Sequence, residues 1–480
     1  MKKITYHLII ALSLAVVATS CKKDLAALNV SPNATSDPQP DYLLTAAQKT
    51  TSDLYWGADN NFNSSLLIIQ HWAKIQYTEP DRYIFSNSSF TSLWNTGYAQ
   101  SITNLNTIIQ LPDEKSNANY RGVALVLRSW VFSLLTDAYG NIPYKQAGKI
   151  QQTVTPVYDT QKDVYFGLLD DLKTAIATLN TSGPAIAGDI IYSGKIDRWK
   201  KLANALRLRI ALRISDKESD KAKQTIAEVL ADNSGLISSN TEIAQFVYTT
   251  SPQQNPMAAW FDTRDDYRIG KTIVDKLKAL SDPRLPVYAS KPTDATVTDY
   301  VGVPSGLTTT DANNLGFAKT SKPGTYFLTA QSPAVIISYA EVLFDRAEAA
   351  ARGYTSENAE ALYKQAITAS LNQYNITDPN TVANYLGQAS VQYNAANFKK
   401  SIGEQKWIAL YGQGLEAFAE WRRLDYPQLT PGVANVLNNQ IPVRFIYPGS
   451  EQTLNTTNYK AAVSAQGTDN LLTKLWFDAY

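Results

Sequence analysis

Cys21 is the only cysteine among the 480 residues, and it follows a short apolar segment with a basic start. Lys2 and Lys3 supply the charge, and residues 8–18 form an apolar run too short to span a membrane. This order is typical of a bacterial export signal whose cleavage leaves a cysteine that receives a diacylglycerol thioether. A signal cut nearby beside an incidental thiol is the alternative. Since an unpaired exported thiol is unusual, we predict lipidation at Cys21 and membrane attachment through the lipid.

Residues for other chemistry are scarce. His7 lies in the signal, so a catalytic triad would depend on His71 alone, and a zinc site would have one imidazole and no thiolate. A packing or surface role is favoured for His71. Asp262, Asp265 and Asp266 offer oxygen ligands, but their spacing lacks the pattern of a calcium loop. We therefore predict no catalytic residue, no metal and no cofactor.

The charge balance excludes one class of partner. The chain has 44 Lys and Arg against 43 Asp and Glu, and removal of residues 1–20 takes away two lysines, leaving 42 against 43. A nearly neutral chain lacks the basic surface that follows phosphates, so nucleic acid is not expected as a partner. By contrast, 28 Tyr and 9 Trp accompany many amide and hydroxyl side chains. This composition suits the recognition of sugars, although it is equally typical of exported proteins in general.

The periodicity of apolar residues is mainly helical. Residues 22–41 hold three prolines and predict a flexible tether. The expected helices cover residues 43–56, 62–75, 94–111, 119–138, 163–179, 199–214, 220–231, 270–280, 338–352, 356–374 and 405–423. Residues 441–448 are expected to be extended. Between residues 245 and 333 the chain is rich in Pro, Gly and Thr with one strong helix, which indicates functional loops.

Pairs of these helices are expected to form hairpins. Helices 338–352 and 356–374, joined through Gly353, resemble a tetratricopeptide (TPR) hairpin, and two further pairs are weaker candidates. These pairs join the helix at Trp94 to helix 119–138, and helix 163–179 to helix 199–214. Two groups of charges are given structural roles. Arginines 207, 209 and 213 are expected to pair with Glu341, Asp345 or Glu348, and residues 420–423 to cap the end of their helix.

Nine stretches occur in a familiar order. They are Cys21, SPN at 31–33, DAYGNIPY at 137–144, DIIYSG at 189–194, WKKLANALRLR at 199–209, SYAEV with RAEA at 338–349, EWRR at 420–423, IPVRFIYP at 441–448 and KLWFD at 474–478. Together they resemble the SusD/RagB family of outer-membrane nutrient-binding lipoproteins, specifically its SusD-like branch. Two departures are Lys195, where an acidic residue is frequent, and Phe477, where a second Trp is common.

The resemblance implies a mainly α fold, a SusD-like α superhelix with TPR-like helical hairpins and a loop-rich ligand-facing region. It also implies a SusC-like TonB-dependent β-barrel transporter as partner, with the hairpins as docking surface, and an outer-membrane location facing the cell exterior. We expect residues 1–20 to be a signal peptide and residues 21–41 the lipidated cysteine and tether. Residues 42–480 would form a single domain containing the loop-rich region 245–333.

In this family the ligand sits on an aromatic platform built from an early segment and the middle loops. Aromatic side chains on loops have no obligatory packing role, which makes them candidates for that platform. The candidate ligand-binding residues are Trp72, Tyr77, Arg82 and Tyr83 in the early segment, and Trp260, Tyr267, Tyr300 and Phe327 in the middle loops.

The resulting hypothesis is a non-enzymatic surface lipoprotein that binds glycans or oligosaccharides and delivers them to the transporter. Peptides or other nutrients are the close alternative ligands. A helical glycoside hydrolase with two carboxylates is a second class, although no acidic pair stands out among the aromatics. A TPR scaffold acting through protein contacts is a third, and it would not need so many aromatics between residues 245 and 333.

Overall fold

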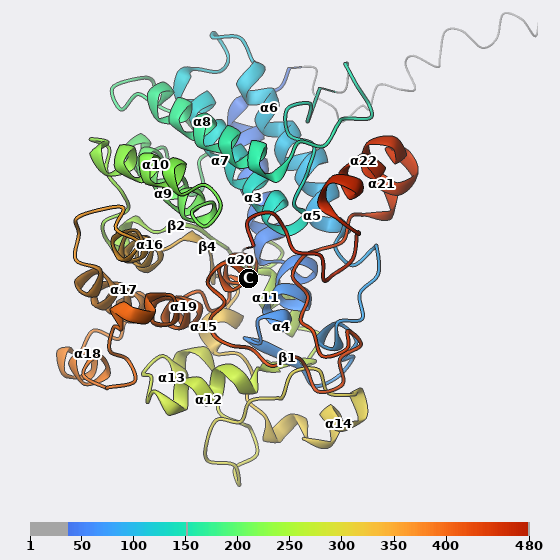
Figure 1. Cartoon of the computed structure of the whole chain (residues 1–480), viewed down its shortest axis with the longest axis vertical. Coiled ribbons are helices and arrows are strands. Elements are labelled where there is room, and N and C mark those ends of the chain that lie inside the picture. Colours follow the sequence, from blue (N-terminus) through green and yellow to red (C-terminus); the bar gives the residue numbers. More distant parts are fainter. Residues whose placement is uncertain (1–36, 150–151, 479–480) are drawn as a thin grey trace, which may run out of the picture. The chain divides into compact units, whose positions relative to one another are not determined.

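Helices make up most of the computed structural model, which describes residues 37–149 and 152–478 (Figure 1). The mainly α prediction is therefore confirmed. The export signal, Cys21 and the tether up to residue 36 lie outside the described residues. Within residues 37–149 and 152–478, no helix combines the length and apolar character that crossing a membrane requires. All elements named below belong to one unit that starts at Pro40.

The first half of the unit is a series of helices in which α6, α7, α8, α9 and α10 each pack against the next. The expected pairs are confirmed, since α6 packs on α7 and α8 packs on α9. Asn117 and Thr160 cap the amino ends of α7 and α8 by accepting backbone N–H bonds. The helices are α3 (Pro40–Trp56), α5 (Thr91–Thr96), α6 (Thr103–Gln110), α7 (Ala118–Tyr139), α8 (Gln161–Thr178), α9 (Ile196–Arg213) and α10 (Ser219–Ala231). Between α5 and α6 the chain continues through the π-helical turn η3 (Gly97–Ile102).

The predicted helix 62–75 is wrong over its second half. A π-helical turn, η1 (Ala58–Ser65), leads into the short α4 (Leu66–Ile68), and strand β1 (Trp72–Lys74) follows. Gln70 takes a φ of 60°, in the left-handed region, which ends the helix. The strand then pairs with residues almost 200 positions away, a contact that local periodicity does not encode.

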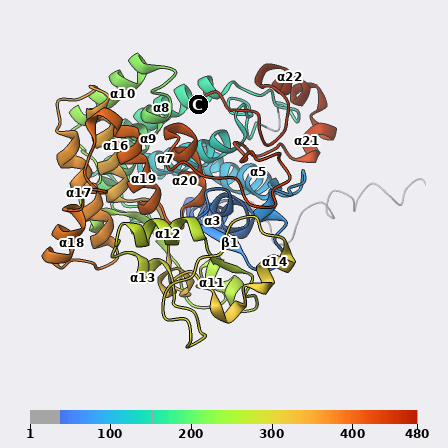
Figure 2. The ribbon, with the colours of Figure 1, turned by 60° about the horizontal axis from the view of Figure 1, so that its bottom comes forward.

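The C-terminal part returns to helices, the first of which, α16, packs against α9 (Figure 2). The hairpin of α16 (Tyr339–Ala351) and α17 (Ala359–Gln373) is confirmed, with Gly353 at a φ of 73° between the two helices. The predicted helix 405–423 is two helices, α19 (Phe398–Ala409) and α20 (Gly414–Leu424). Gly412 separates them at a φ of 87°, where an added Cβ would lie 3.1 Å from Trp56 and Phe327.

Three further C-terminal helices were not expected. They are α18 (Pro379–Leu386), α21 (Gly449–Leu454) and α22 (Thr456–Gln466). Residues 441–448 form no strand, but Phe445 N–H donates to the carbonyl of Ala138 at the end of α7.

The middle segment is loop-rich, as predicted, and two small sheets hold it. At its base β2 (Ala244–Val247) pairs antiparallel with β4 (Pro333–Ile337), and further along β3 (Tyr267–Ile269) pairs with β1. The helices of this segment are short. They are α11 (Pro256–Phe261), α12 (Lys271–Ala279), α13 (Leu285–Tyr288), α14 (Thr309–Asn314) and α15 (Thr325–Leu328).

A buried network of ion pairs joins α9, α16, α19 and α20. Glu420 is its centre, accepting from Lys406 Nζ at 2.6 Å, from Arg423 at 2.6 and 2.9 Å, and from Arg213. Arg423 also pairs with Glu348. Although burial opposes ionisation, these cations hold the pKa of Glu420 well below its usual value. An unpaired charge in the core would carry a large desolvation penalty. The ion pairs offset this penalty, which is why these charged side chains can be buried.

The expected roles of the arginines are partly confirmed. Arg209 donates to Glu341 at 2.7 Å, as predicted, whereas Arg207 pairs with Glu228 of α10 at 2.7 Å. Residues 420–423 do end a helix with positive charge in its last turn, as expected, and Arg422 donates at 3.1 Å to the carbonyl of Phe418 in that helix. Arg422 also donates at 2.8 Å to the carbonyl of Asp137, in the last turn of α7, and so caps a second helix.

Candidate functional site

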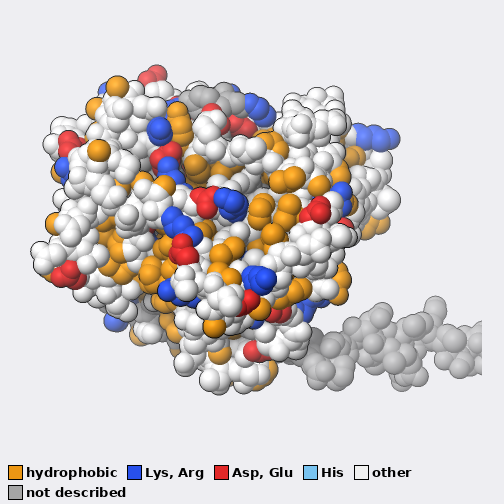
Figure 3. Space-filling model, turned by 90° about the horizontal axis from the view of Figure 1, so that it is seen from below, with side chains coloured by type: hydrophobic (Ala, Val, Ile, Leu, Met, Phe, Trp, Pro, Cys, Tyr) orange, Lys and Arg blue, Asp and Glu red, His pale blue; other side chains and the backbone are white. Residues whose placement is uncertain are grey.

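The sheet of β1 and β3 brings the two predicted ligand regions together. Trp72 lies opposite Ile269 and Lys74 lies opposite Tyr267 in an antiparallel ladder. The early segment that follows β1 therefore lies beside the loop that precedes β3. Seen from below, this end of the molecule carries hydrophobic side chains interspersed with Lys, Arg, Asp and Glu side chains (Figure 3).

Three side chains from these two regions form a stack at the surface. The guanidinium carbon of Arg264 lies 5.0 Å from the ring centroid of Tyr77 and 4.8 Å from that of Trp260. Tyr77 is 53 % exposed, and the Arg264 side chain is 41 % exposed. Cation–π attraction stabilises such an arrangement and fixes the direction of the rings. We call Tyr77, Arg264 and Trp260 the Arg264 stack.

Asp266 holds the stack from beneath. Its carboxylate accepts from Trp260 Nε1 at 2.9 Å, from Lys74 Nζ at 2.9 Å and from Arg264 at 3.1 Å. Burial opposes ionisation of this carboxyl, yet Lys74 and the other donors lower its pKa. Nearby Asp81 accepts from the backbone N–H of Lys74, and burial raises the pKa of Asp81 to about 7. Buried, hydrogen-bonded polar groups therefore hold the side chains of the stack in place.

Four of the predicted ligand residues lie in the core. Trp72 donates from Nε1 to the Tyr411 hydroxyl at 2.9 Å, and Tyr267 donates to Asn63 at 2.7 Å. Side chains this deeply buried offer a ligand no surface, so we assign them to packing. The four are Trp72, Tyr83, Tyr267 and Phe327.

The remaining two predicted residues lie at the surface outside the stack. Arg82 donates from Nε to the carbonyl of Ala434 at 2.9 Å. Tyr300 is partly buried, and the Lys291 ammonium lies 5.9 Å from its ring centroid. Among the described residues no hydrogen bond or ring contact joins Tyr300 to the stack. Arg264 was missed, although an arginine beside loop aromatics is a recognisable partner for their rings.

The aspartates considered for calcium are occupied by protein donors. Asp262 accepts from Gln254, Asp265 pairs with Arg268 at 2.8 Å and with Lys322 at 2.9 Å, and Asp266 serves the stack. His71 is fully buried against Trp407 and Tyr411. Burial lowers the pKa of His71 to about 3, so the imidazole is neutral at physiological pH, which agrees with a packing role.

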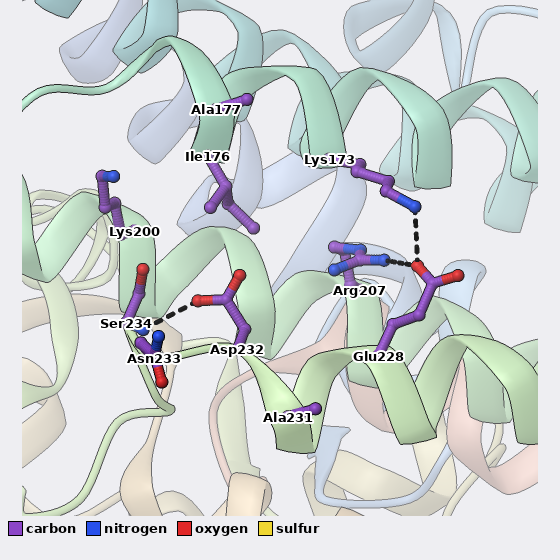
Figure 4. Close-up of a pocket in the computed structure, with 10 residues that line it drawn as sticks. All are labelled: Lys173, Ile176, Ala177, Lys200, Arg207, Glu228, Ala231, Asp232, Asn233 and Ser234. Carbon is purple, nitrogen blue, oxygen red and sulfur yellow. Dashed lines mark hydrogen bonds and ion pairs between the residues drawn. The ribbon is translucent and has the colours of Figure 1, made fainter.

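A pocket of about 620 Å³ lies elsewhere, between α8, α9 and α10 (Figure 4). Its charges are largely paired with one another, since Glu228 accepts from Arg207 at 2.7 Å and from Lys173 at 3.1 Å. None of the predicted ligand residues lines it. The pocket shows no aromatic wall, and we do not assign the ligand to it.

The comparisons agree with the fold and with the sequence motifs. Residues 32–448 match the family model SusD-like_2, described as starch-binding associating with outer membrane. The chain therefore belongs to the SusD-like family, a family of binding proteins. This confirms the resemblance noted from the motifs.

Solved structures of similar fold cover nearly the whole chain. A structure titled chitin-binding protein is 28 % identical, with a TM-score of 0.83 over 92 % of this chain and all of that one. A SusD homologue from Bacteroides uniformis is 24 % identical, with a TM-score of 0.83 over 93 % and 100 % of the two chains. A chitin-binding SusD homologue from Flavobacterium johnsoniae is 24 % identical, with a TM-score of 0.82 over 91 % and 98 %. No curated protein shows a significant match to the chain.

Proposed function

We propose that this chain is a non-enzymatic surface protein that binds glycans or oligosaccharides and delivers them to a SusC-like TonB-dependent transporter. The observation that carries the proposal is the Arg264 stack, in which the exposed ring of Tyr77 and the partly buried ring of Trp260, one from each of the two expected regions, flank a planar donor group. Family membership supports it, because the family description names carbohydrate binding and the outer membrane.

The chemistry of the stack suits a sugar. The apolar CH face of a pyranose can lie against Tyr77 or Trp260, while hydroxyl groups accept from Arg264. Asp266 keeps Trp260 and Arg264 in place, so little side-chain freedom is lost when a ligand binds. Because the 28 % identical structure is titled chitin-binding, chitin oligosaccharides are the first ligands to test.

Replacement of Tyr77 by Ala should weaken oligosaccharide binding without unfolding the protein. Aromatic stacking contributes about 0.5–1.5 kcal/mol, which corresponds to a roughly 2- to 13-fold loss of affinity. Tyr77 is half exposed, so the midpoint of thermal unfolding should stay close to the wild-type value. Calorimetric titration beside a thermal melt measures both quantities.

The matched control is Tyr42→Ala, because Tyr42 is 75 % exposed and lies at the start of α3, outside the stack. Its affinity should equal that of the wild type. Equal affinities for the Tyr77 and Tyr42 variants would show that the stack does not contact the ligand.

We also propose that the protein is held on the outer membrane by lipid at Cys21, which precedes the described residues. Cys21→Ala removes the only thiol, so acylation becomes impossible. The variant should appear as soluble periplasmic protein or as uncleaved precursor, and it should incorporate no radioactive fatty acid. Cys21→Ser is the closest control in size and should behave in the same way. Unchanged labelling of either variant would refute lipidation at this position.

The proposed partner makes a separate prediction. A lid over a transporter buries a wide surface, and interfaces of that size survive extraction in mild detergent. We therefore expect this chain to co-purify with a large β-barrel protein, in similar amounts for the wild type and the Tyr77→Ala variant. Recovery of the chain alone, while the barrel is expressed, would contradict the partnership but would leave ligand binding untouched.

A further inference from the structure

A second, smaller pocket lies on a different part of the molecule. It has a volume of about 250 Å³ and lies where η3, the loop after α7, and α21 meet. Trp94, Tyr98, Pro143 and Pro156 form its apolar walls, and the Glu451 carboxylate is its charged group. We call it the Trp94 pocket. None of the residues that line the Trp94 pocket belongs to the Arg264 stack, which lies next to β1 and β3.

The aromatic wall of the Trp94 pocket is rigid. The Trp94 ring centroid lies 5.1 Å from that of Tyr98 and 5.9 Å from that of Tyr158. Both tyrosine hydroxyls are fixed, because Tyr98 donates to the Pro143 carbonyl at 2.7 Å and Tyr158 donates to Glu451 Oε2 at 2.6 Å. The wall is therefore preorganised, and a ligand that contacts it need not order it.

Two polar atoms at this pocket have no hydrogen-bond partner among the described residues. Glu451 uses Oε2 for Tyr158 and for Asn455 Nδ2, at 3.3 Å, while Oε1 accepts nothing. The indole N–H of Trp94, a residue only 5 % exposed, donates to nothing in the same part of the chain. A free acceptor and a free donor thus accompany an apolar wall.

This combination selects among ligand classes. A sugar hydroxyl donates and accepts, so a pyranose can serve both Glu451 and Trp94 while its CH face contacts the aromatic wall. An ammonium group has donors only and would leave the indole N–H unsatisfied. Pockets for drug-sized ligands usually have volumes of about 300–1,000 Å³. The Trp94 pocket is smaller, which indicates a ligand of a single ring.

We propose that the Trp94 pocket binds one neutral saccharide ring, as a site separate from the Arg264 stack. The pocket would engage a terminal or branching sugar unit, whereas the exposed stack can follow a longer chain. The two sites differ in the length of ligand that they accept, and this difference makes them separable by experiment.

The test uses methyl glycosides of glucose and of N-acetylglucosamine as single-ring probes, detected by saturation-transfer NMR on the full mature chain. Ala99→Trp and Thr103→Trp each place a large ring in the pocket from exposed positions of its rim. Either variant should weaken probe binding about tenfold or more. Gln100→Trp, next to Ala99 but outside the lining, is the matched control and should leave binding unchanged. A thermal midpoint equal to that of the wild type identifies a variant that has kept the fold. One folded blocking variant is enough for the test.

A background carrying Tyr77→Ala separates this proposal from the proposed function. Probe binding should persist there and still be lost with Ala99→Trp, even if oligosaccharide binding at the stack proves absent. Undiminished probe binding in a folded blocking variant would overturn the proposal, and so would a wild type that binds no probe. Displacement of the probe by tetramethylammonium would also overturn it, because the pocket would then be a cation site.

Discussion

Glu420→Ala is expected to lower the free energy of unfolding by about 3–5 kcal/mol, the cost of removing one partner from a buried ion pair. Glu420 accepts from Arg213, Lys406 and Arg423, and each of these side chains is almost fully buried. The substitution leaves their positive charges facing one another with one carboxylate fewer. Urea denaturation at neutral pH, followed by circular dichroism, measures the loss.

The control is Glu360→Ala on the surface of α17. Glu360 pairs with Lys364 at 2.6 Å, but both side chains are about half exposed, and solvated pairs of this kind contribute about 0–1 kcal/mol. A Glu420→Ala variant as stable as Glu360→Ala would mean that the network at the centre of the helices does not hold them together.

Trp72→Ala is expected to cost about 3–5 kcal/mol of stability, as truncation of a large core aromatic does. Trp72 has no exposed surface, contacts Phe62, Phe261 and Tyr267, and binds the Tyr411 hydroxyl through its indole N–H. The cavity left behind would open directly under β1. A strongly lowered thermal midpoint is the expected result.

The comparison with Tyr77→Ala separates core aromatics from surface aromatics five residues apart. Tyr77→Ala should change affinity and spare the midpoint, and Trp72→Ala should change the midpoint first. Trp72→Phe, which keeps a ring in the cavity, should recover part of the stability. A Trp72→Ala variant with a wild-type melt and weakened binding would place Trp72 among the ligand contacts after all.

Periodicity predicted the helices well wherever one face is apolar over many turns. The helices 119–138, 163–179 and 199–214 match α7, α8 and α9 to within a few residues. Periodicity failed where the conformation of a single residue ends a helix. At Gly412 a left-handed φ divides a continuous apolar pattern into α19 and α20. Periodicity also failed at β1, whose pairing partner is distant in sequence.

The candidate site was predicted as two regions but not as a set of side chains. A loop aromatic in the sequence carries no sign of whether it points inward, so Trp72 and Tyr267 looked the same as Tyr77 and Trp260. The β1–β3 ladder decides, because Trp72 and Tyr267 belong to these two strands, whose residues are all buried, whereas Tyr77 and Trp260 lie outside them. Arg264 had no sequence signal of its own beyond its position near Trp260, since its role depends on a ring supplied by the other region.

The pairing of β2 with β4 places Val247 opposite Pro333, so the chain enters and leaves the intervening segment at adjacent points. The segment therefore begins and ends at one small sheet, and it contributes Trp260 and Arg264, whereas Tyr77 comes from the segment that follows β1. An exchange of residues 248–332 for the equivalent stretch of a relative would need to keep the two strands at the base, the ladder to β1 and the buried contacts with the C-terminal helices, such as those of Arg284 with Ser370 and Gln405 and of Tyr288 with the Ile408 carbonyl. Ligand preference in such proteins can then diverge by replacement of one contiguous stretch, while the surface that the helices present to other proteins stays the same.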